Sequence, residues 1–276
     1  MISLEENRIV DRQTVTKRIL FIGDIVAGAG RGIVERNLRR LQQDLNIDFT
    51  IANGENSAHG FGMSKKTYLE LSSFGIDAFT LGNHSWDNRE IFSFLEQTQN
   101  IIRPANMEGN FPGQGCRIFE LGEMKLAIIN LLGQIYMSPA GCPFAQMNRL
   151  LEALSGKATN IIVDMHAEAT SEKMALGWYL DGKVSAVLGT HTHIQTNDAR
   201  ILPKGTAYIT DVGMTGPRDS VLGMDRELVL RRFITKKSNR LHPALGDVQF
   251  NAVVLDISSD GTAKKIEFCN LVENQF

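Results

Sequence analysis

Residues Arg18–Gly23 read RILFIG, a nearly continuous apolar run. Such a run is typical of a β-strand that other elements cover on both faces. Two further short runs, Phe49–Asn53 and Ala78–Leu81, predict two more strands in the first hundred residues. Because helical patterns fill the intervals between them, this part of the chain predicts stacked layers with a largely parallel sheet.

Three helices are predicted between and after these strands. The first covers Ile33–Leu45, where apolar residues fall on one stripe. The second begins after Ser64, a residue suited to cap a helix, and runs to about Phe74. The third covers Asp87–Thr98. The segment 28–32 (GAGRG) between the first strand and the first helix reads as a flexible turn, because a dinucleotide fingerprint would need a glycine at Ile33.

The pattern changes after residue 110, and a mixed pair of sheets is predicted. Further strands are expected at Cys116–Leu121, Met124–Leu132, Asn160–Asp164, Val184–Leu188 and Ala207–Val212, with helices at Pro143–Leu154, Ser171–Tyr179 and Arg226–Phe233. Residues 247–272 alternate in polarity around Asp260–Gly261 and predict a closing antiparallel hairpin. Residues 214–246 are expected to form an irregular insertion near the site. Residues 1–17 are expected to be a mobile extension of one domain, 18–276.

Composition excludes several classes of protein. The chain of 276 residues has 29 basic and 31 acidic groups and is 43% hydrophobic, so it has material for a core and no charge excess for coating nucleic acid. Three scattered cysteines favour a reducing cytoplasm over a disulfide framework. No apolar run approaches the roughly 20 residues of a membrane span. The composition is compatible with a homo-oligomer.

Five polar motifs follow predicted strands. They are Gly23-Asp24, Gly54-Glu55-Asn56, Gly82-Asn83-His84, His166 and Gly189-Thr190-His191-Thr192-His193. Ligands gather beyond the carboxyl ends of strands in open α/β sheets, so these side chains are expected to share one crevice. We interpret the preceding glycines as residues that let the backbone turn sharply.

The donor types predict a dinuclear metal site. Seven carboxylate, amide and imidazole groups exceed what one tetrahedral zinc needs, and such mixed donors suit iron, manganese, zinc or cobalt. Because a carboxylate can bridge two cations, two metals about 3.5–4 Å apart are expected. Each motif also has an ordinary structural interpretation: Asp24 as a helix cap, Asn83 as a left-handed turn residue, His166 as a hydrogen-bonded core residue. The His191-x-His193 pair is the strongest single signal, because alternate strand residues face one side. The coincidence of all five motifs favours the site.

The same motifs resemble the calcineurin-like metallophosphoesterase superfamily, and within it the YmdB-type branch. The branch-like stretches include LFIGDIVAGAGR, NGENSAHGFG, TLGNHSWD, GTHTHIQT and the segment ending VGMTGPRDSVLGMD, within about Arg18 to Asp225. The usual first histidine of the superfamily pattern is missing at Val26, and Glu55 replaces the usual bridging aspartate. Both departures are features of the branch.

This resemblance implies an αββα sandwich of two mixed sheets flanked by helices, with a small cap or insertion. It implies a phosphodiesterase for small cyclic nucleotides, among them 2′,3′-cyclic nucleotides. By motif matching, one metal would be held by Asp24, Glu55, Asn56 and His193, and the other by Glu55, Asn83, His166 and His191. Iron is implied as the metal, with manganese as a substitute and zinc or magnesium less favoured.

His84 matches the proton donor of the family and lies one residue after Asn83. General chemistry supports this role, because a hydroxide bridging two metals would expel an alkoxide that needs a proton. His59, in a loop with Gly60 and Gly62, is a candidate substrate contact. Two other functions are compatible with parts of the sequence. A regulatory protein that binds a nucleotide or RNA with incidental hydrolysis remains the alternative, and a dinucleotide-dependent oxidoreductase is disfavoured by the missing glycine.

Overall fold

Strand β1 (Thr16–Ile22) lies at the centre of the molecule and belongs to two cores at once. A computed structural model of the chain describes residues 15–274. Ile19 and Phe21 of β1 face the core between two β-sheets, whereas Leu20 and Ile22 face the core under the helices. All four side chains are fully buried. This two-sided burial is why the run shows no polar alternation.

The first sheet places parallel and antiparallel neighbours on either side of β1. Its strand order is β2-β12-β13-β1-β3-β4-β5, and β14 pairs with β13. Strand β1 pairs in parallel with β3 and antiparallel with β13. The other strands are β2 (Asp24–Ile25), β3 (Phe49–Asn53), β4 (Ala78–Thr80), β5 (Ile101–Ile102), β12 (Met214–Pro217), β13 (Val248–Ser258) and β14 (Ala263–Glu273).

The second sheet has the order β10-β11-β9-β8-β7-β6. Its central strands β7, β8, β9 and β11 are parallel, and the edge strands β6 and β10 are antiparallel to their neighbours. Its strands are β6 (Cys116–Leu121), β7 (Met124–Leu132), β8 (Asn160–His166), β9 (Ala186–Thr190), β10 (Arg200–Ile201) and β11 (Ala207–Ile209).

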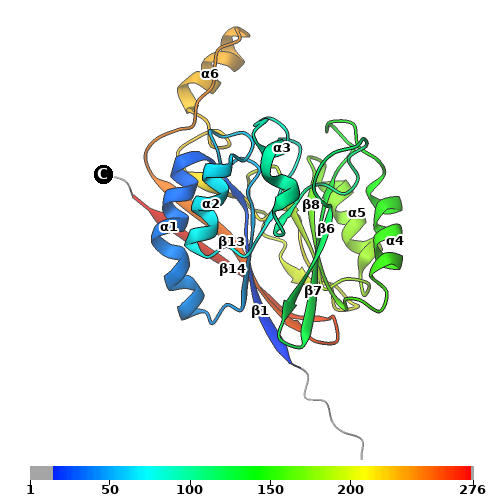
Figure 1. Cartoon of the computed structure of the whole chain (residues 1–276). Helices are drawn as coiled ribbons and strands as arrows, with labels where there is room; N and C mark the ends of the chain where they lie inside the picture. The colour runs from blue at the N-terminus through cyan, green and yellow to red at the C-terminus, as the bar shows by residue number, and fades with distance from the viewer. Residues whose placement is uncertain (1–14, 275–276) are drawn as a thin grey trace, which may run out of the picture.

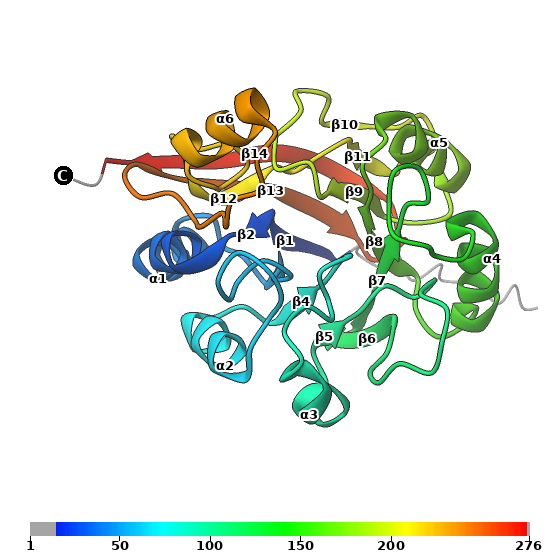
Figure 2. The same cartoon turned by 90° about the horizontal axis from the view of Figure 1, so that it is seen from above.

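Helices cover the outer faces of both sheets (Figures 1 and 2). One layer packs on the first sheet and includes α1 and α2, while α4 and α5 pack on the second sheet. The helices are α1 (Ala27–Asp44), α2 (Lys65–Phe74), α3 (Ile91–Phe94), the 3₁₀ helix η1 (Leu95–Gln97), α4 (Pro143–Leu154), α5 (Thr170–Leu180) and α6 (Arg226–Thr235). The predicted sandwich of two mixed sheets flanked by helices is confirmed, as are the hairpins β6–β7 and β13–β14.

The interpretation of residues 28–32 as a flexible turn is wrong. Helix α1 already begins at Ala27, six residues before the predicted start, and includes all three glycines of GAGRG. A Cβ atom on Gly30 would collide with the carbonyl oxygen of Thr215. Gly30 therefore allows α1 to pack against β12, which a sequence pattern cannot reveal.

The predicted helix Asp87–Thr98 is much shorter in the structure. Only Ile91–Phe94 is α-helical, and Leu95–Gln97 continues as a 3₁₀ turn. The preceding residues form tight turns instead: the Asp87 amide donates to the carbonyl of His84 at 3.1 Å, and the Asp87 carboxylate binds the His84 ring. Asp87 therefore stabilises a turn at the site instead of starting a helix.

Two segment boundaries also differ from the prediction. Thr16 and Lys17, placed in the N-terminal extension, belong to β1, and residues 1–14 of that extension lie outside the described residues. Residues 214–246 are not irregular throughout, because Met214–Pro217 is a buried strand of the first sheet. Beyond it, α6 projects from the body of the molecule at the upper left of Figure 1.

Two findings bear on the class of protein. Across residues 15–274, no helix is both long and apolar enough to cross a membrane. The three cysteines within that range are free.

Candidate metal centre

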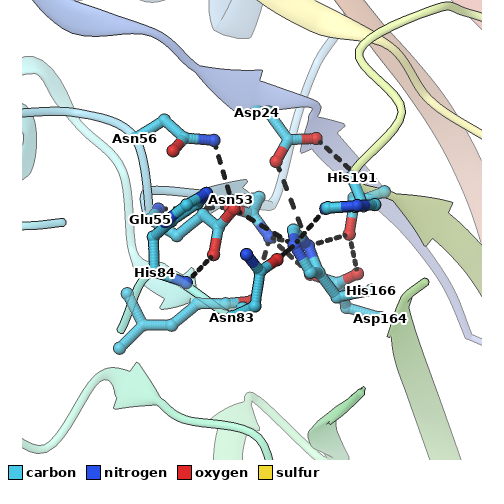
Figure 3. A network of polar contacts seen from close by, with 12 residues as sticks. Asp24, Asn53, Glu55, Asn56, Asn83, His84, Asp164, His166 and His191 are labelled. Atoms are coloured by element: carbon cyan, nitrogen blue, oxygen red, sulfur yellow. Dashed lines mark hydrogen bonds and ion pairs between the residues drawn. The ribbon is translucent and has the colours of Figure 1, made fainter. Parts of the chain in front are cut away.

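The five polar motifs lie at one edge of the sandwich, where strands of both sheets end. Glu55 and Asn56 follow β3, Asn83 and His84 follow β4, and Asp24 lies in β2 directly after β1. His166 is the last residue of β8, and His191 follows β9. Figure 3 shows these side chains pointing toward one another from both sheets. His193 joins them with its Nε2 3.8 Å from Oδ1 of Asp24, so the structure brings together all seven side chains that the sequence suggested as metal ligands.

His166 is the centre of one group of donors. Its Nε2 lies 3.1 Å from Oε1 of Glu55, 2.9 Å from Oδ1 of Asn83 and 3.2 Å from Nδ1 of His191. The donor atoms of Glu55, His166 and His191 lie within 4.8 Å of one another, an arrangement suited to one metal ion. His166 and Glu55 are buried, so water competes little for these atoms.

A second group lies beside the first and shares Glu55 with it. Nε2 of His193 lies 3.8 Å from Oδ1 of Asp24 and 3.1 Å from Nδ2 of Asn56. The same Asn56 amide donates to Oε1 of Glu55 at 3.2 Å. With this amide turned over, Oδ1 of Asn56 would face the group in place of the nitrogen. Glu55 therefore stands between the two groups, as a bridging carboxylate would.

The outward nitrogen of His166 is fixed by a buried chain of hydrogen bonds. Its Nδ1 lies 2.9 Å from Oγ1 of Thr190, whose hydroxyl donates to Oδ1 of Asp164 at 2.6 Å. The Thr190 oxygen thus accepts the Nδ1 proton. Asn53 donates to Oδ2 of Asp164 at 3.1 Å and completes this arrangement. The ring is therefore held with Nε2 facing the cluster, as in histidines that bind metals.

The other two histidines are held in the same manner. Nε2 of His191 lies 3.1 Å from Oε2 of Glu168, and Nδ1 of His193 donates to the carbonyl of Leu222 at 3.0 Å. In each ring one nitrogen has an outer acceptor and the other faces the cluster. The tautomer that this selects leaves an inward lone pair on each ring.

Electrostatics at the centre favour a positive charge. Burial lowers the pKa of His166, but the charge and hydrogen bond of Glu55, together with the charges of Asp24 and Asp164, outweigh burial and raise it to about 9. Burial likewise raises the pKa of Glu55, but His166 and His84 outweigh it and lower it to about 2. Burial, followed by the charge on His166, lowers the pKa of His191 to about 3. In the metal-free protein, a proton on His166 partly balances the negative charge of the buried carboxylates. A metal cation would balance that charge more fully.

An unpartnered atom gives an independent test of whether these residues fit a metal. Oδ1 of Asp24 is buried and accepts no hydrogen bond, although Oδ2 accepts the backbone N–H of His191 at 3.1 Å. Burial raises the pKa of Asp24. Buried polar atoms are nearly always satisfied, so this unpartnered carboxylate oxygen beside His193 is suited to bind a cation. The carboxylate, amide and imidazole donors, without sulfur, fit manganese or iron.

The glycines before the candidate ligands do not provide the sharp backbone turns that the sequence predicted. Gly23, Gly54, Gly82 and Gly189 are not among the glycines with positive φ, so they do not supply a left-handed turn. A Cβ atom on Gly82 would instead collide with Oε2 of Glu55 and Nε2 of His166. Gly82 therefore makes room for the ligand side chains.

His191 and His193 are also placed differently from the strand alternation that the sequence predicted. Both residues lie beyond the end of β9, with φ angles of 99° and 65°. Strand alternation does not place them on one side. Two left-handed residues turn the chain so that both rings reach the cluster.

An open cavity of about 250 Å³ adjoins the centre. His84 lines it, with Nδ1 2.8 Å from Oδ2 of Asp87 and its backbone N–H donating to Oε2 of Glu55. The remaining lining residues are Glu55, Asn56, Gly60, Phe61, Glu168, His191, Thr192, His193, Leu222 and Met224. His84 is thus beside the candidate ligands without belonging to the central group.

His59 is exposed and is not among the residues that line the cavity. The substrate contact suggested for it is therefore not supported by its position. Phe61, two residues later, lines the cavity instead, and its ring meets that of His84 edge to face with centroids 4.9 Å apart. Positive φ at Gly60 and Gly62 shapes the loop so that Phe61 faces inward.

Sequence reasoning missed the residues that hold the ligands in place. Asp164 is a charged residue inside the apolar strand β8, two positions before His166, and this could have marked it. Glu168 lies two positions after His166 and carries no comparable signal. Asn53 is the polar end of an apolar strand. Leu222 acts through its backbone carbonyl, which no side-chain pattern can reveal.

Comparison with known proteins identifies the family of this chain. Residues 20–269 match the family model described as YmdB-like protein. The chain is 48% identical to a 2′,3′-cyclic-nucleotide 2′-phosphodiesterase of Bacillus subtilis, over 93% of this chain and 97% of that protein. A crystal structure of a novel phosphatase from Mycoplasma pneumoniae superposes with a TM-score of 0.90 at 36% identity, covering 95% of each chain.

A second solved structure, a hypothetical protein from Thermus thermophilus, superposes with a TM-score of 0.88 at 42% identity and covers 93% of this chain and 99% of that one. The family match spans nearly the whole sandwich and includes every strand end that contributes to the centre. The resemblance inferred from the motifs is confirmed: the chain belongs to the YmdB-like family of calcineurin-like metallophosphoesterases.

Proposed function

We propose that this protein hydrolyses 2′,3′-cyclic nucleotides at a centre that holds two metal ions. That the chain is a hydrolase of phosphoric diester bonds follows from its family and its named relative. The observation that carries the finer proposal is the position of Glu55. Its carboxylate contacts His166 of one donor group and Asn56 of the other. An anionic group shared in this way is what a two-metal centre requires.

The donor groups suggest which residues hold each ion. Asn83, His166 and His191 would bind one ion, Asp24, Asn56 and His193 the other, and Glu55 both. We propose iron as the native metal, with manganese as a substitute. Ions bound here would supply Lewis acidity, which stabilises negative charge on the phosphoryl oxygens and activates water for attack.

His84 is proposed to donate the proton that the leaving oxygen needs. Asp87 accepts from Nδ1, which orients the ring and leaves Nε2 for the substrate. The backbone N–H of His84 is anchored on Glu55 at 2.9 Å, so the proton donor is positioned by the same carboxylate that joins the two donor groups. A ribose alkoxide is a poor leaving group, so this proton matters most for a cyclic nucleotide.

The cavity walls favour a small nucleoside phosphate with a single negative charge. Phe61, Leu222 and Met224 give an apolar surface on which a nucleobase can stack or pack. Glu168 adds a carboxylate, and among residues 15–274 no lysine or arginine lines the cavity. A phosphodiester carries one charge fewer than the monoester product, so this lining favours binding of the substrate and release of the product.

Two measurements test the proposal. Protein purified without air and analysed for metals should contain about two ions per chain. Reconstitution with Mn²⁺ should support hydrolysis of 2′,3′-cyclic AMP far faster than hydrolysis of 3′-AMP or 5′-AMP. One tightly bound zinc ion per chain, or hydrolysis of monoesters at the same rate, would contradict it.

A further inference from the structure

Lys173 and Asp211 form a buried ion pair that does not line the cavity. Nζ of Lys173, in α5, lies 2.6 Å from Oδ2 of Asp211, which follows β11, and both side chains are fully buried. Burying two charges costs desolvation energy that their attraction rarely exceeds by much. The pair is therefore better explained by the hydrogen bonds that Asp211 accepts nearby than by a contribution to the stability of the fold.

Asp211 holds the residue between two proposed metal ligands. Its Oδ2 accepts both the backbone N–H of Thr192 at 3.0 Å and the Thr192 hydroxyl at 2.7 Å. Thr192 separates His191 from His193, both of which have left-handed backbone conformations. Such conformations are costly for residues other than glycine and persist only where the surroundings fix them. The two hydrogen bonds to Thr192 supply that fixation.

The other oxygen of Asp211 reaches the segment that holds Asp24. Oδ1 accepts the N–H of Gly213 at 2.8 Å, and the Gly213 carbonyl accepts the N–H of Asp24 at 3.0 Å. Asp24 in turn accepts the N–H of His191 through Oδ2. One carboxylate therefore links segments that carry three proposed ligands.

Lys173 reaches Asp211 because the neighbouring residue in β9 is Gly189, which has no side chain. A Cβ atom on Gly189 would lie 2.9 Å from Cδ of Lys173 and still closer to the carbonyl oxygen of Thr210. Glycine at the end of β9 thus leaves space for the lysine stem. The ammonium group balances the charge that lets Asp211 accept several donors at once.

We infer that Asp211, charge-balanced by Lys173, is a positioning residue that sets the loop 190–193 for metal binding. The inference rests on the proposed function, because the residues that Asp211 positions are metal ligands only under that proposal. Asp211 does not line the cavity, and its carboxylate reaches the ligand segments through Thr192 and Gly213.

Two variants separate positioning from general stability. Thr192→Val removes the hydroxyl hydrogen bond to Asp211 and leaves the Lys173–Asp211 ion pair intact. The double variant K173M/D211N removes both charges. An amide offers an acceptor on one side only, so either Thr192 or Gly213 loses its partner. Thr206→Val is the matched control: Thr206 is fully buried, and its hydroxyl donates to the Val184 carbonyl at 2.6 Å, at the opposite end of the sheet.

Calorimetric titration with Mn²⁺ alone is the first measurement. Loss of an outer hydrogen-bond partner typically weakens metal binding about 10–100-fold, and we expect this in both variants but not in Thr206→Val. The second measurement is amide hydrogen exchange of residues 190–193 in metal-free protein, which should become faster in both variants. Melting temperatures monitor overall stability.

Wild-type Mn²⁺ affinity together with wild-type exchange of residues 190–193 in both variants would overturn the inference. An equal loss of affinity in Thr206→Val would also overturn it, because the effect would then be one of general stability. If the wild-type protein binds Mn²⁺ but hydrolyses no cyclic nucleotide, the proposed function fails while the exchange and titration results still decide the role of Asp211.

Discussion

Nδ1 of His84 lies 2.8 Å from Oδ2 of Asp87, three residues further along the same turn. The contact fixes the ring beside the cavity, and the His84 backbone is tied separately to Glu55. The ring can therefore be removed without removing a ligand side chain from either donor group. This separation makes His84 the most direct test of the proposed chemistry.

His84→Ala should retain both metal ions and the fold but lose most of its activity on a 2′,3′-cyclic nucleotide. General acid catalysis contributes about 10²–10⁴-fold, which corresponds to about 3–5 kcal/mol of transition-state stabilisation. The loss should be smaller on bis-p-nitrophenyl phosphate, because p-nitrophenolate leaves readily without a proton. The measurement is kcat/KM on both substrates, with metal content determined in parallel. Equal proportional losses, with chemistry rate-limiting, would exclude the proton-donor role.

Glu55→Ala should be more harmful than Asn56→Ala. Glu55 lies between the two donor groups and carries a charge, whereas Asn56 offers one neutral oxygen to one group. We expect Glu55→Ala to lose nearly all bound metal and Asn56→Ala to lose about one ion. Metal analysis after dialysis and the rate of cyclic nucleotide hydrolysis check this. The same residual metal content in both variants would contradict a bridging role for Glu55.

Thr190→Val should weaken metal binding without unfolding the protein. The variant removes the oxygen that accepts from Nδ1 of His166 and interrupts the chain to Asp164, whose pKa burial raises to about 6. Loss of the hydrogen-bond partner of a metal-binding histidine typically weakens metal affinity about 10–100-fold. Mn²⁺ titration measures the effect, with Thr206→Val as control. Unchanged affinity would show that His166 is oriented by other contacts.

Metal affinity should rise with pH up to about pH 9 and then level off. In metal-free protein Glu55, Asp24 and Asp164 raise the pKa of His166 to about 9 against the effect of burial, so below that pH the ring carries a second proton. A metal must displace this proton, which makes the apparent affinity rise about tenfold per pH unit below the pKa. Mn²⁺ titrations between about pH 6.5 and 9.5 measure the slope. Glu55→Gln should move the plateau to lower pH, and a flat profile in the wild-type protein would refute the expectation.

Phe61→Ala should raise KM for a cyclic nucleotide by about tenfold, since stacking on an aromatic ring contributes about 1–3 kcal/mol per base. A cyclic phosphate without a base should be hydrolysed with nearly unchanged KM, and Phe61→Tyr should restore the wild-type value. Phe268→Ala is the control, because Phe268 is 41% exposed on β14 and does not line the cavity. Equal KM changes for substrates with and without a base would exclude stacking.

Much of the fold could be predicted because its signals are local. Strands β1, β3 and β8 have more consecutive apolar residues than an exposed strand has. The start of helix α2 is indicated by Ser64, whose side chain accepts the N–H of Thr67 as a cap. Predictions failed where a local pattern was overruled by packing. Gly30 looks like part of a turn, yet it lies in a helix because only glycine fits against Thr215.

The sequence by itself determined the fold class, the family and the seven candidate ligands, because ligands at strand ends follow from strand periodicity and from motifs a few residues long. Tertiary structure alone decided how those ligands are held. Asp211 reaches Thr192 across 19 positions, and Asp24 reaches the amide of His191 across 167. Side-chain periodicity carries information over a few residues only, whereas a hydrogen bond depends on where two distant backbones come to lie once the sheets have packed.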